Sequence, residues 1–380
     1  DAASLTRLVV RRGMVLVGVG MAIGLPAGLA GARLAESLLF ETAPLDPAML
    51  AGVAGIVTGE RQGELSHLNV RSARRGTPNA YVRDSHEAFR PYDGHLVRLV
   101  VAHGGFSVTP DVPLPEAEAW WTAHRPESVD LPEIDGTYDV LATLAQIGAD
   151  DAGGRATLRV GGKAANLARL YTVLPARHQV PGFAIPFEYY VEYMATNTVL
   201  DRRADPPVRR TLADYVVALD GDGRFRTDPA WRALRLAELR AAIETQGAVS
   251  PGLVAALAER IPAVFGPGTM VRFRSSSNAE DDLRFNGAGL YDSTSVCAED
   301  SLDADAAGPS HCDPRQPKER SIERGIRLVW ASLWNARAWD ERAYYGIDQR
   351  RIAMAVLVTP AFPDERANGV AFTGNPTSPG

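Results

Sequence analysis

The stretch VRFRSSSNAEDDLRFNGAGLYD, residues 271–292, decides how the chain is interpreted. It begins with Val271 and Phe273 on either side of Arg272, which is the two-residue period of a half-buried strand. Arg274 ends that strand, and the serines and glycines after it predict a polar loop. Guanidinium groups, hydroxyls and backbone amides in such a loop bind phosphate oxygens well. The alternative is a solvated loop with a surface arginine.

A second element suited to anions lies upstream, in the sequence VGGKAANLARL of residues 160–170. Gly161 and Gly162 permit close approach of the backbone, and Lys163 carries a point charge. A helix that begins here adds the positive end of its dipole. The spacing differs from the P-loop pattern, and a lone GGK is most often a turn before a helix. Two such elements in one domain favour phosphate binding more strongly than either alone.

Four motifs occur in a fixed order along the chain. They are GGKAANL (161–167), VPGF (180–183), RSSSNAED with FNGAGLYDS (274–293) and WASLWNARAWDER (330–342). Together they resemble the ATP-binding domain of pyruvate phosphate dikinase and phosphoenolpyruvate synthase, which the glucan water dikinases share. The resemblance covers roughly residues 160–380. It implies an α/β fold of the ATP-grasp type in which Lys163 and Arg274 contact the ATP phosphates.

The same resemblance implies a wider set of residues around the nucleotide. Magnesium is expected to accompany ATP, because phosphoryl transfer depends on positioning and charge neutralisation. No metal ligand is expected within this chain. The expected ATP-binding residues are Gly161, Gly162, Lys163, Arg274, Ser275, Ser276, Glu280 and Arg337.

The composition is that of an ordinary globular protein. A length of 380 residues predicts two or three domains, and 46% hydrophobic with 23% charged residues allows a sizeable core. The net charge of −6 does not suggest a nucleic-acid partner. Two cysteines speak against a disulfide scaffold and fit a reducing compartment, so we expect the catalytic part to be cytoplasmic.

Residues 51–110 contain a histidine in a basic setting. His67 follows Ser66, and three arginines come soon after it. Histidine is a nucleophile near neutral pH, and arginines stabilise an incoming phosphoryl group, although a lone histidine is more often structural. The segment resembles the swivelling phosphohistidine domain of the same dikinases, whose acceptor sits in a Ser-His or Thr-His step ahead of an arginine. That resemblance implies His67 as the phosphoryl acceptor.

Residues 1–50 are expected to form a separate hydrophobic segment. The uncharged run at residues 13–32 is long enough to cross a bilayer and is the only part expected to contact a membrane; a buried helix rich in glycine and alanine is the alternative. The segment resembles the tail of an FtsX-type ABC permease. The flanking charges would place everything after residue 40 outside the cell. Since an ATP-using domain belongs inside, either the run does not insert as a single span or the segment is a fused or misassembled fragment.

The remaining organisation follows from composition and periodicity. We expect a linker at residues 111–150, with a short helix near 140–147, that lets the His67 domain move. The ATP-binding domain then fills 151–380, with mainly helical residues at 187–265 and one helix at 322–345. The acidic segment 297–318 is expected to be solvated, because a zinc site from Cys297, His311 and Cys312 lacks CxxC spacing.

The C-terminal part departs from the family pattern. Residues 352–358 and 369–373 predict paired strands, but Thr359 lies where relatives resembling phosphoenolpyruvate synthase carry glutamine. The chain stops at Gly380, ahead of the expected acidic magnesium ligands, so it looks like a fragment of a longer enzyme.

The function implied by the resemblance is a double phosphotransfer. The β-phosphoryl group of ATP would pass to His67 and then to a small-molecule or glucan acceptor, with pyruvate as the first candidate. A histidine domain ahead of the ATP domain resembles the glucan water dikinase order. Two alternatives stay open, a catalytically inactive nucleotide-binding regulatory module and a membrane-anchored transporter subunit. The sequence leaves the acceptor and the oligomeric state undetermined.

Overall fold

The computed structural model describes residues 54–362, except 64–67, 70–71, 74–75, 103, 152, 281–284, 286, 288 and 303–306, together with residue 365. At its centre is an antiparallel sheet in the order β5-β10-β8-β9. These strands are β5 (Phe183–Ile185), β8 (Val271–Ser277), β9 (Thr294–Val296) and β10 (Met354–Pro360). The predicted α/β class is confirmed in this coarse sense.

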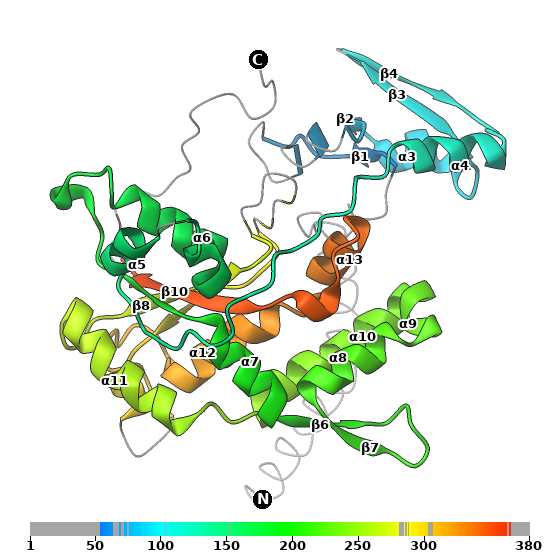
Figure 1. The fold of residues 1–380 in the computed structure, drawn as a ribbon. Helices are drawn as coiled ribbons and strands as arrows, with labels where there is room; N and C mark the ends of the chain where they lie inside the picture. Colours follow the sequence, from blue (N-terminus) through cyan, green and yellow to red (C-terminus); the bar gives the residue numbers. More distant parts are fainter. Residues whose placement is uncertain are drawn as a thin grey trace, which may run out of the picture. The chain divides into compact units, whose positions relative to one another are not determined.

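Helices cover both faces of this sheet (Figure 1). On one face lie α5 (Leu144–Asp150) and α6 (Ala156–Leu170), whose buried residues pack against Ala184 and Leu357 of the strands. On the other face lie α7 (Phe187–Thr196) and α12 (Ile322–Ser332), within a larger core that includes Phe183 and Val356. Neighbouring strand residues serve opposite cores because side chains alternate across a sheet.

Residues 187–265 are mainly helical, as predicted. The helices after α7 are α8 (Leu212–Asp220), α9 (Gly223–Thr227), α10 (Pro229–Ala241), η4 (Ala242–Gln246) and α11 (Pro251–Phe265), and the short η3 (Ala176–His178) precedes β5. The hairpin of β6 (Thr198–Asp201) and β7 (Val208–Thr211) was not predicted. It is held by Asp201, which is buried and accepts hydrogen bonds from Arg203 and Arg210.

The single helix predicted at 322–345 is wrong. The chain forms α12 and then α13 (Ala336–Tyr344), with a break at residues 333–335, followed by η6 (Gln349–Arg351). The apolar stripe of the prediction is confirmed as core, since Ile326, Trp330 and Trp334 are all buried. Gly346, with a φ of 61°, follows the end of α13.

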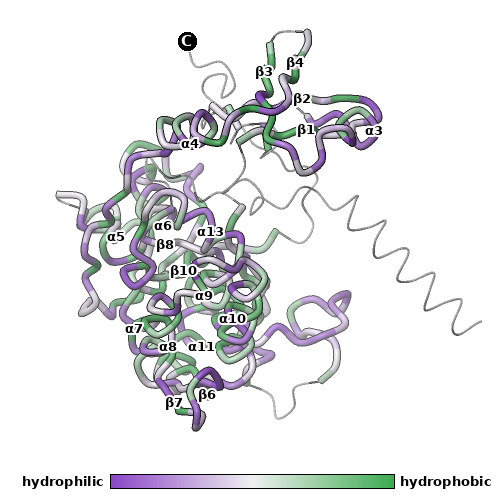
Figure 2. The backbone as a smooth tube through the Cα atoms, turned by 90° about the vertical axis from the view of Figure 1, so that its right-hand side faces the viewer, coloured by the Kyte–Doolittle hydropathy of each residue, from purple (hydrophilic) through white to green (hydrophobic). Residues whose placement is uncertain are grey.

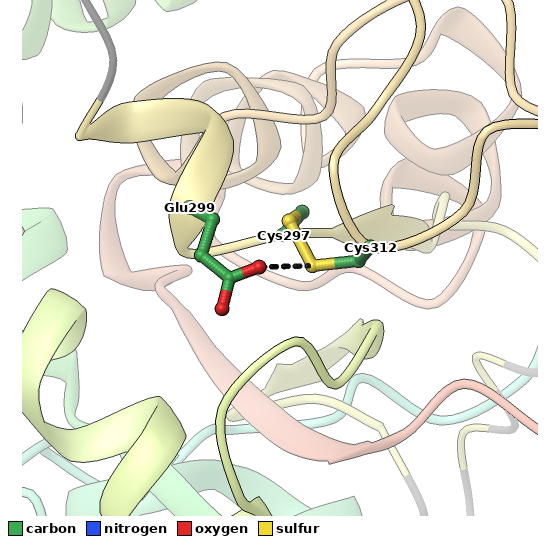
Figure 3. Close-up of side chains that lie close together, drawn as sticks. All are labelled: Cys297, Glu299 and Cys312. Carbon is green, nitrogen blue, oxygen red and sulfur yellow. Dashed lines mark hydrogen bonds between the residues drawn. A yellow bond between two sulfur atoms is a disulfide. The ribbon is translucent and has the colours of Figure 1, made fainter.

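The acidic segment after β9 is exposed at many of its described residues, as predicted, but it is also anchored at several points, which was not predicted. Cys297 and Cys312 form a disulfide with a Cα–Cα distance of 5.7 Å (Figure 3). The buried Asp300, in η5 (Glu299–Ser301), accepts backbone hydrogen bonds from His311 at 2.8 Å and Arg320 at 2.7 Å. The expectation of reduced cysteines is therefore wrong. A zinc site built on these two cysteines would need their thiolates, which a disulfide does not offer.

The part before residue 124 contains two small sheets. A parallel pair joins β1 (Ile56–Thr58) and β2 (Asn79–Tyr81), and a hairpin joins β3 (Arg98–Ala102) and β4 (Gly105–Thr109), with β3 shown in green as hydrophobic in Figure 2. Helices α3 (Ser85–Phe89), η2 (Arg90–Tyr92) and α4 (Leu114–Ala123) complete this part. His67, residues 1–53 and the predicted strand at 369–373 lie outside the described residues.

Among the residues that the structure describes, no single helix is long and apolar enough to span a membrane. Pro229–Gln246 and Pro251–Phe265 meet the criteria of length and composition only as a pair, which is bent by 71°.

Candidate phosphate-binding site

The first glycine of the GGK motif lies where α6 meets β8. Gly161 interrupts α6 with a φ of 78° and a ψ of 169°. A Cβ atom at this position would lie 2.1 Å from the carbonyl oxygen of Ser276, closer than any side chain permits. The motif thus opens the second part of α6, as predicted, but residues 156–160 already form a helical turn before it. The close approach that glycine allows is to the backbone of β8.

Ser276 bridges this interruption of the helix. Its Oγ donates to the carbonyl oxygen of Val160 at 2.7 Å and accepts from the backbone N–H of Ala164 at 3.0 Å. Both backbone groups flank the break, where intrahelical partners are lost. Residues 275–277 were predicted in a loop and instead form the buried end of β8, because their hydroxyls find partners there.

Lys163 is held at the same junction by two side chains. Its Nζ donates to Ser275 Oγ and to Glu280 Oε1, each at 3.0 Å. The Glu280 side chain is 3% exposed and the Lys163 side chain 34%. Ser277 fixes the carboxylate by donating its backbone N–H to Glu280 Oε2 at 2.9 Å. The lysine is therefore oriented by a buried carboxylate while its own side chain stays accessible to an incoming anion.

Arg274 adds a second cation on β8. It is exposed, and it lies on the same face as Arg272 and Ser276 because alternate residues of a strand share a face. Burial and the neighbouring charge of Arg274 lower the pKa of Arg272 below its ordinary value. Positive charge is thus concentrated on the face of β8 that α6 covers, which favours binding of a polyanion.

Arg337 is engaged elsewhere in this state. It donates to the carbonyl oxygen of Leu290 at 3.1 Å and to Asp292 Oδ1 at 3.0 Å. The structure thus brings together Gly161, Gly162, Lys163, Ser275, Ser276 and Glu280, whereas Arg337 holds the segment after the glycine-rich loop.

Sequence reasoning did not single out Ser277, Tyr291 or Arg342. Arg342 is fully buried and donates to Tyr291 Oη at 3.2 Å. The sequence offered one signal for Arg342. It lies four residues after Ala338, and residues at this spacing share one side of a helix, here a buried side of α13.

The described residues also line a cavity of about 530 Å³ between α7, α8 and η6. It is bordered by Tyr190, Met194, Val216 and Ile352, and none of the expected ATP-binding residues contributes to it.

Comparison with known proteins identifies the family of this domain. The model of the pyruvate phosphate dikinase AMP/ATP-binding domain matches residues 157–379. The chain belongs to this family. All of the expected ATP-binding residues lie within the range of the pyruvate phosphate dikinase match, and His67 precedes it. The match lends no support to the permease resemblance of residues 1–50.

Curated relatives of this pyruvate phosphate dikinase family member match between about a fifth and three fifths of the chain. Rifampicin phosphotransferase of Streptomyces sviceus is 31% identical over 221 residues, which are 58% of this chain and 21% of the relative. A probable phosphoenolpyruvate synthase of Pyrococcus horikoshii is 26% identical over 244 residues, 58% of this chain and 27% of the relative. The phosphoenolpyruvate synthase of Aeropyrum pernix is 33% identical over 85 residues, 22% of this chain and 10% of the relative. The matches to the first two span roughly a fifth to a quarter of their length.

Proposed function

We propose that this protein is an ATP-dependent phosphotransferase in which Lys163 and Arg274 bind the phosphates of ATP. The observation that carries the proposal is the Lys163 amino group, held 3.0 Å from both Ser275 and Glu280 within the residues that match the ATP-binding family. An ammonium group oriented in this way, together with the exposed guanidinium of Arg274 on β8, can neutralise phosphate charge without reorganising the fold.

The proposed reaction is that of a dikinase. ATP, accompanied by Mg²⁺, gives its β-phosphoryl group to His67, and the phosphohistidine then gives it to an acceptor. We assign no protein ligand for the magnesium ion among the described residues. His67 is proposed from its resemblance to the phosphohistidine motif and from the basic residues that follow it.

The acceptor is proposed as a small molecule such as pyruvate, or a glucan. The relatives' names cover more than one reaction, since one is a rifampicin phosphotransferase and others are phosphoenolpyruvate synthases. We place the catalytic part in the cytoplasm, where ATP is available. The family match favours this proposal over a regulatory module or a transporter subunit.

Labelled ATP tests the proposal directly. The protein is incubated with Mg²⁺ and with ATP labelled at either the β or the γ phosphorus, in parallel with the variants His67→Ala and His86→Ala. His86, in the short helix α3, is the matched control. We expect acid-labile label on the protein from the β position alone, present in His86→Ala and absent in His67→Ala. Absence of label from a protein that binds ATP would contradict the dikinase reaction.

A further inference from the structure

Helix α13 fastens the segment that follows the glycine-rich loop. Its N-cap residue Asn335 donates to the carbonyl oxygen of Leu290 and to Asp292 Oδ2, both at 3.2 Å. Arg337 donates to the same two residues at 3.1 and 3.0 Å. The Leu290 carbonyl group and the Asp292 side chain, on either side of Tyr291, are therefore both held by the start of one helix.

Arg342, near the end of α13, is a buried cation that contacts Tyr291. Arg342 is 0% exposed and donates to Gln349 Oε1 at 2.7 Å, to the Leu333 carbonyl oxygen at 2.9 Å and to Tyr291 Oη at 3.2 Å. The guanidinium group also lies about 6 Å from the Tyr291 and Trp334 ring centres. Burial of a charge is unfavourable unless its hydrogen bonds are satisfied, so these contacts fix the orientation of Arg342.

Tyr291 connects this cation to the proposed ATP site. Burial raises the pKa of Tyr291, while the charge of Arg342 and a hydrogen bond from Ser277 lower it. Ser277 Oγ also accepts the backbone N–H of Glu280 at 3.0 Å. Gly287 lies between Glu280 and Tyr291, where there is no room for a side chain. A Cβ atom at this position would lie 2.8 Å from Glu280 Cγ and 3.4 Å from Tyr291 Cε2. Tyr291 thus accepts a hydrogen bond from Arg342 and packs beside Gly287, which also contacts the Glu280 side chain whose carboxylate orients Lys163.

We propose that Arg342 is a positioning residue for the ATP site, acting through Tyr291 on Glu280 and hence on Lys163. The inference rests on the proposed function, since it assumes that Lys163 binds ATP. Arg342 itself does not touch the nucleotide. Its contribution is to hold the Glu280 carboxylate in the one orientation that presents the lysine, which is how supporting residues preorganise a binding site.

The variant Tyr291→Phe tests this arrangement with little change in packing. It keeps the buried ring and removes the hydroxyl that accepts a hydrogen bond from Arg342. The matched control is Asp340→Asn, also on α13, which loses the hydrogen-bonded ion pair between Asp340 and Arg232 at 2.7 Å. Affinity for ATP with Mg²⁺ is measured by titration calorimetry on each full chain, and the melting temperature is recorded beside it.

We expect Tyr291→Phe to weaken ATP binding by about three- to tenfold, within the range of one typical intramolecular hydrogen bond. Asp340→Asn is expected to keep the affinity of the wild type even where it lowers the melting temperature. If Tyr291→Phe binds as tightly as the wild type, the positioning role is overturned while the proposed function stands. If the wild type itself does not bind ATP, the proposed function fails, and this inference with it.

A double-mutant cycle tests whether Tyr291 acts through Glu280. Tyr291→Phe is repeated in a protein that already carries Glu280→Gln. If Tyr291 acts through Glu280, the effect of the tyrosine substitution on ATP affinity shrinks to less than about twofold, because coupled residues are non-additive. A full additive loss in the double variant would mean that Tyr291 acts only on general stability, and would overturn the proposal.

Discussion

At Gly161 the backbone of α6 lies against the backbone of β8, and no other residue fits. We predict that Gly161→Ala destabilises the fold more than Gly153→Ala does. Both glycines have a positive φ, of 78° and 87°, but only at Gly161 would an added Cβ atom collide with a neighbouring atom. A Cβ atom there would lie 2.1 Å from the Ser276 carbonyl oxygen, whereas one at Gly153 would face open space.

Chemical unfolding of the two variants measures this difference. Gly153→Ala should lower the free energy of unfolding by about 1–2 kcal/mol, the penalty of a left-handed backbone for alanine. Gly161→Ala should lower it further and should also weaken ATP binding, because Lys163 follows two residues later. Equal losses of stability in both variants would contradict the close approach seen between α6 and β8.

We predict that Asp201 makes the stability of the hairpin β6–β7 depend on pH. Burial raises the pKa of this carboxyl, but hydrogen bonds from Arg203 and Arg210 more than offset it and leave the pKa below its ordinary 3.8. The unfolded carboxyl therefore takes up a proton first as the pH falls. The stabilisation is complete above pH 4 and is lost as the pH falls through the lowered pKa.

The variant Asp201→Asn tests this contribution. At pH 7 it should lower the free energy of unfolding by roughly 3 kcal/mol, the effect of removing one partner from a buried ion pair. The difference from the wild type should shrink between pH 4 and pH 2, as measured by guanidinium unfolding at each pH. A difference that stays constant with pH would assign the loss to packing rather than to charge.

At the scale of elements, the segment between β9 and α12 depends on its disulfide. We predict that Cys312→Ser lowers the free energy of unfolding by about 3 kcal/mol, the chain-entropy value for a loop of this size. The two cysteines are 15 residues apart, and Asp300 holds the intervening loop by accepting backbone hydrogen bonds.

A reductant provides the matched measurement for the disulfide. Treatment of the wild type with dithiothreitol should lower its melting temperature toward that of Cys312→Ser, and should leave the variant unchanged. Mass spectrometry of the untreated wild type should find no free thiol at Cys297. A melting temperature that does not respond to reduction would contradict a stabilising disulfide.

The elements that periodicity reveals were predictable, and those that depend on distant partners were not. The stripe through Ile326 and Trp330 identified α12, but the break at residues 333–335 depends on Asn335, which precedes α13 and donates its side-chain amide to the Leu290 carbonyl oxygen far back in the sequence. The serines at 275–277 look like a loop by composition. They lie in β8 because α6 and Glu280 satisfy their hydroxyls.

The same distinction applies to the candidate site. Lys163 and Arg274 could be predicted from short motifs, because each motif carries its own charge and glycine pattern. Glu280 was included through the motif, but its part as the counter-ion of Lys163 depends on the meeting of α6 and β8. Arg342 and Tyr291 could not be predicted, since their relation to Glu280 exists only once α13 has packed.

At the scale of the whole molecule, the central claim is that the domain at residues 157–379 binds ATP through Lys163. Calorimetric titration of ATP with Mg²⁺ into the wild type, Lys163→Met and Arg169→Met tests it. Arg169 lies on the same helix and pairs with Asp151 at 2.8 Å, so it controls for loss of a cation from α6. We predict binding by the wild type and by Arg169→Met, and at least about a tenfold loss in Lys163→Met, the effect of a lost charged hydrogen bond. Equal affinity in all three proteins would contradict the claim.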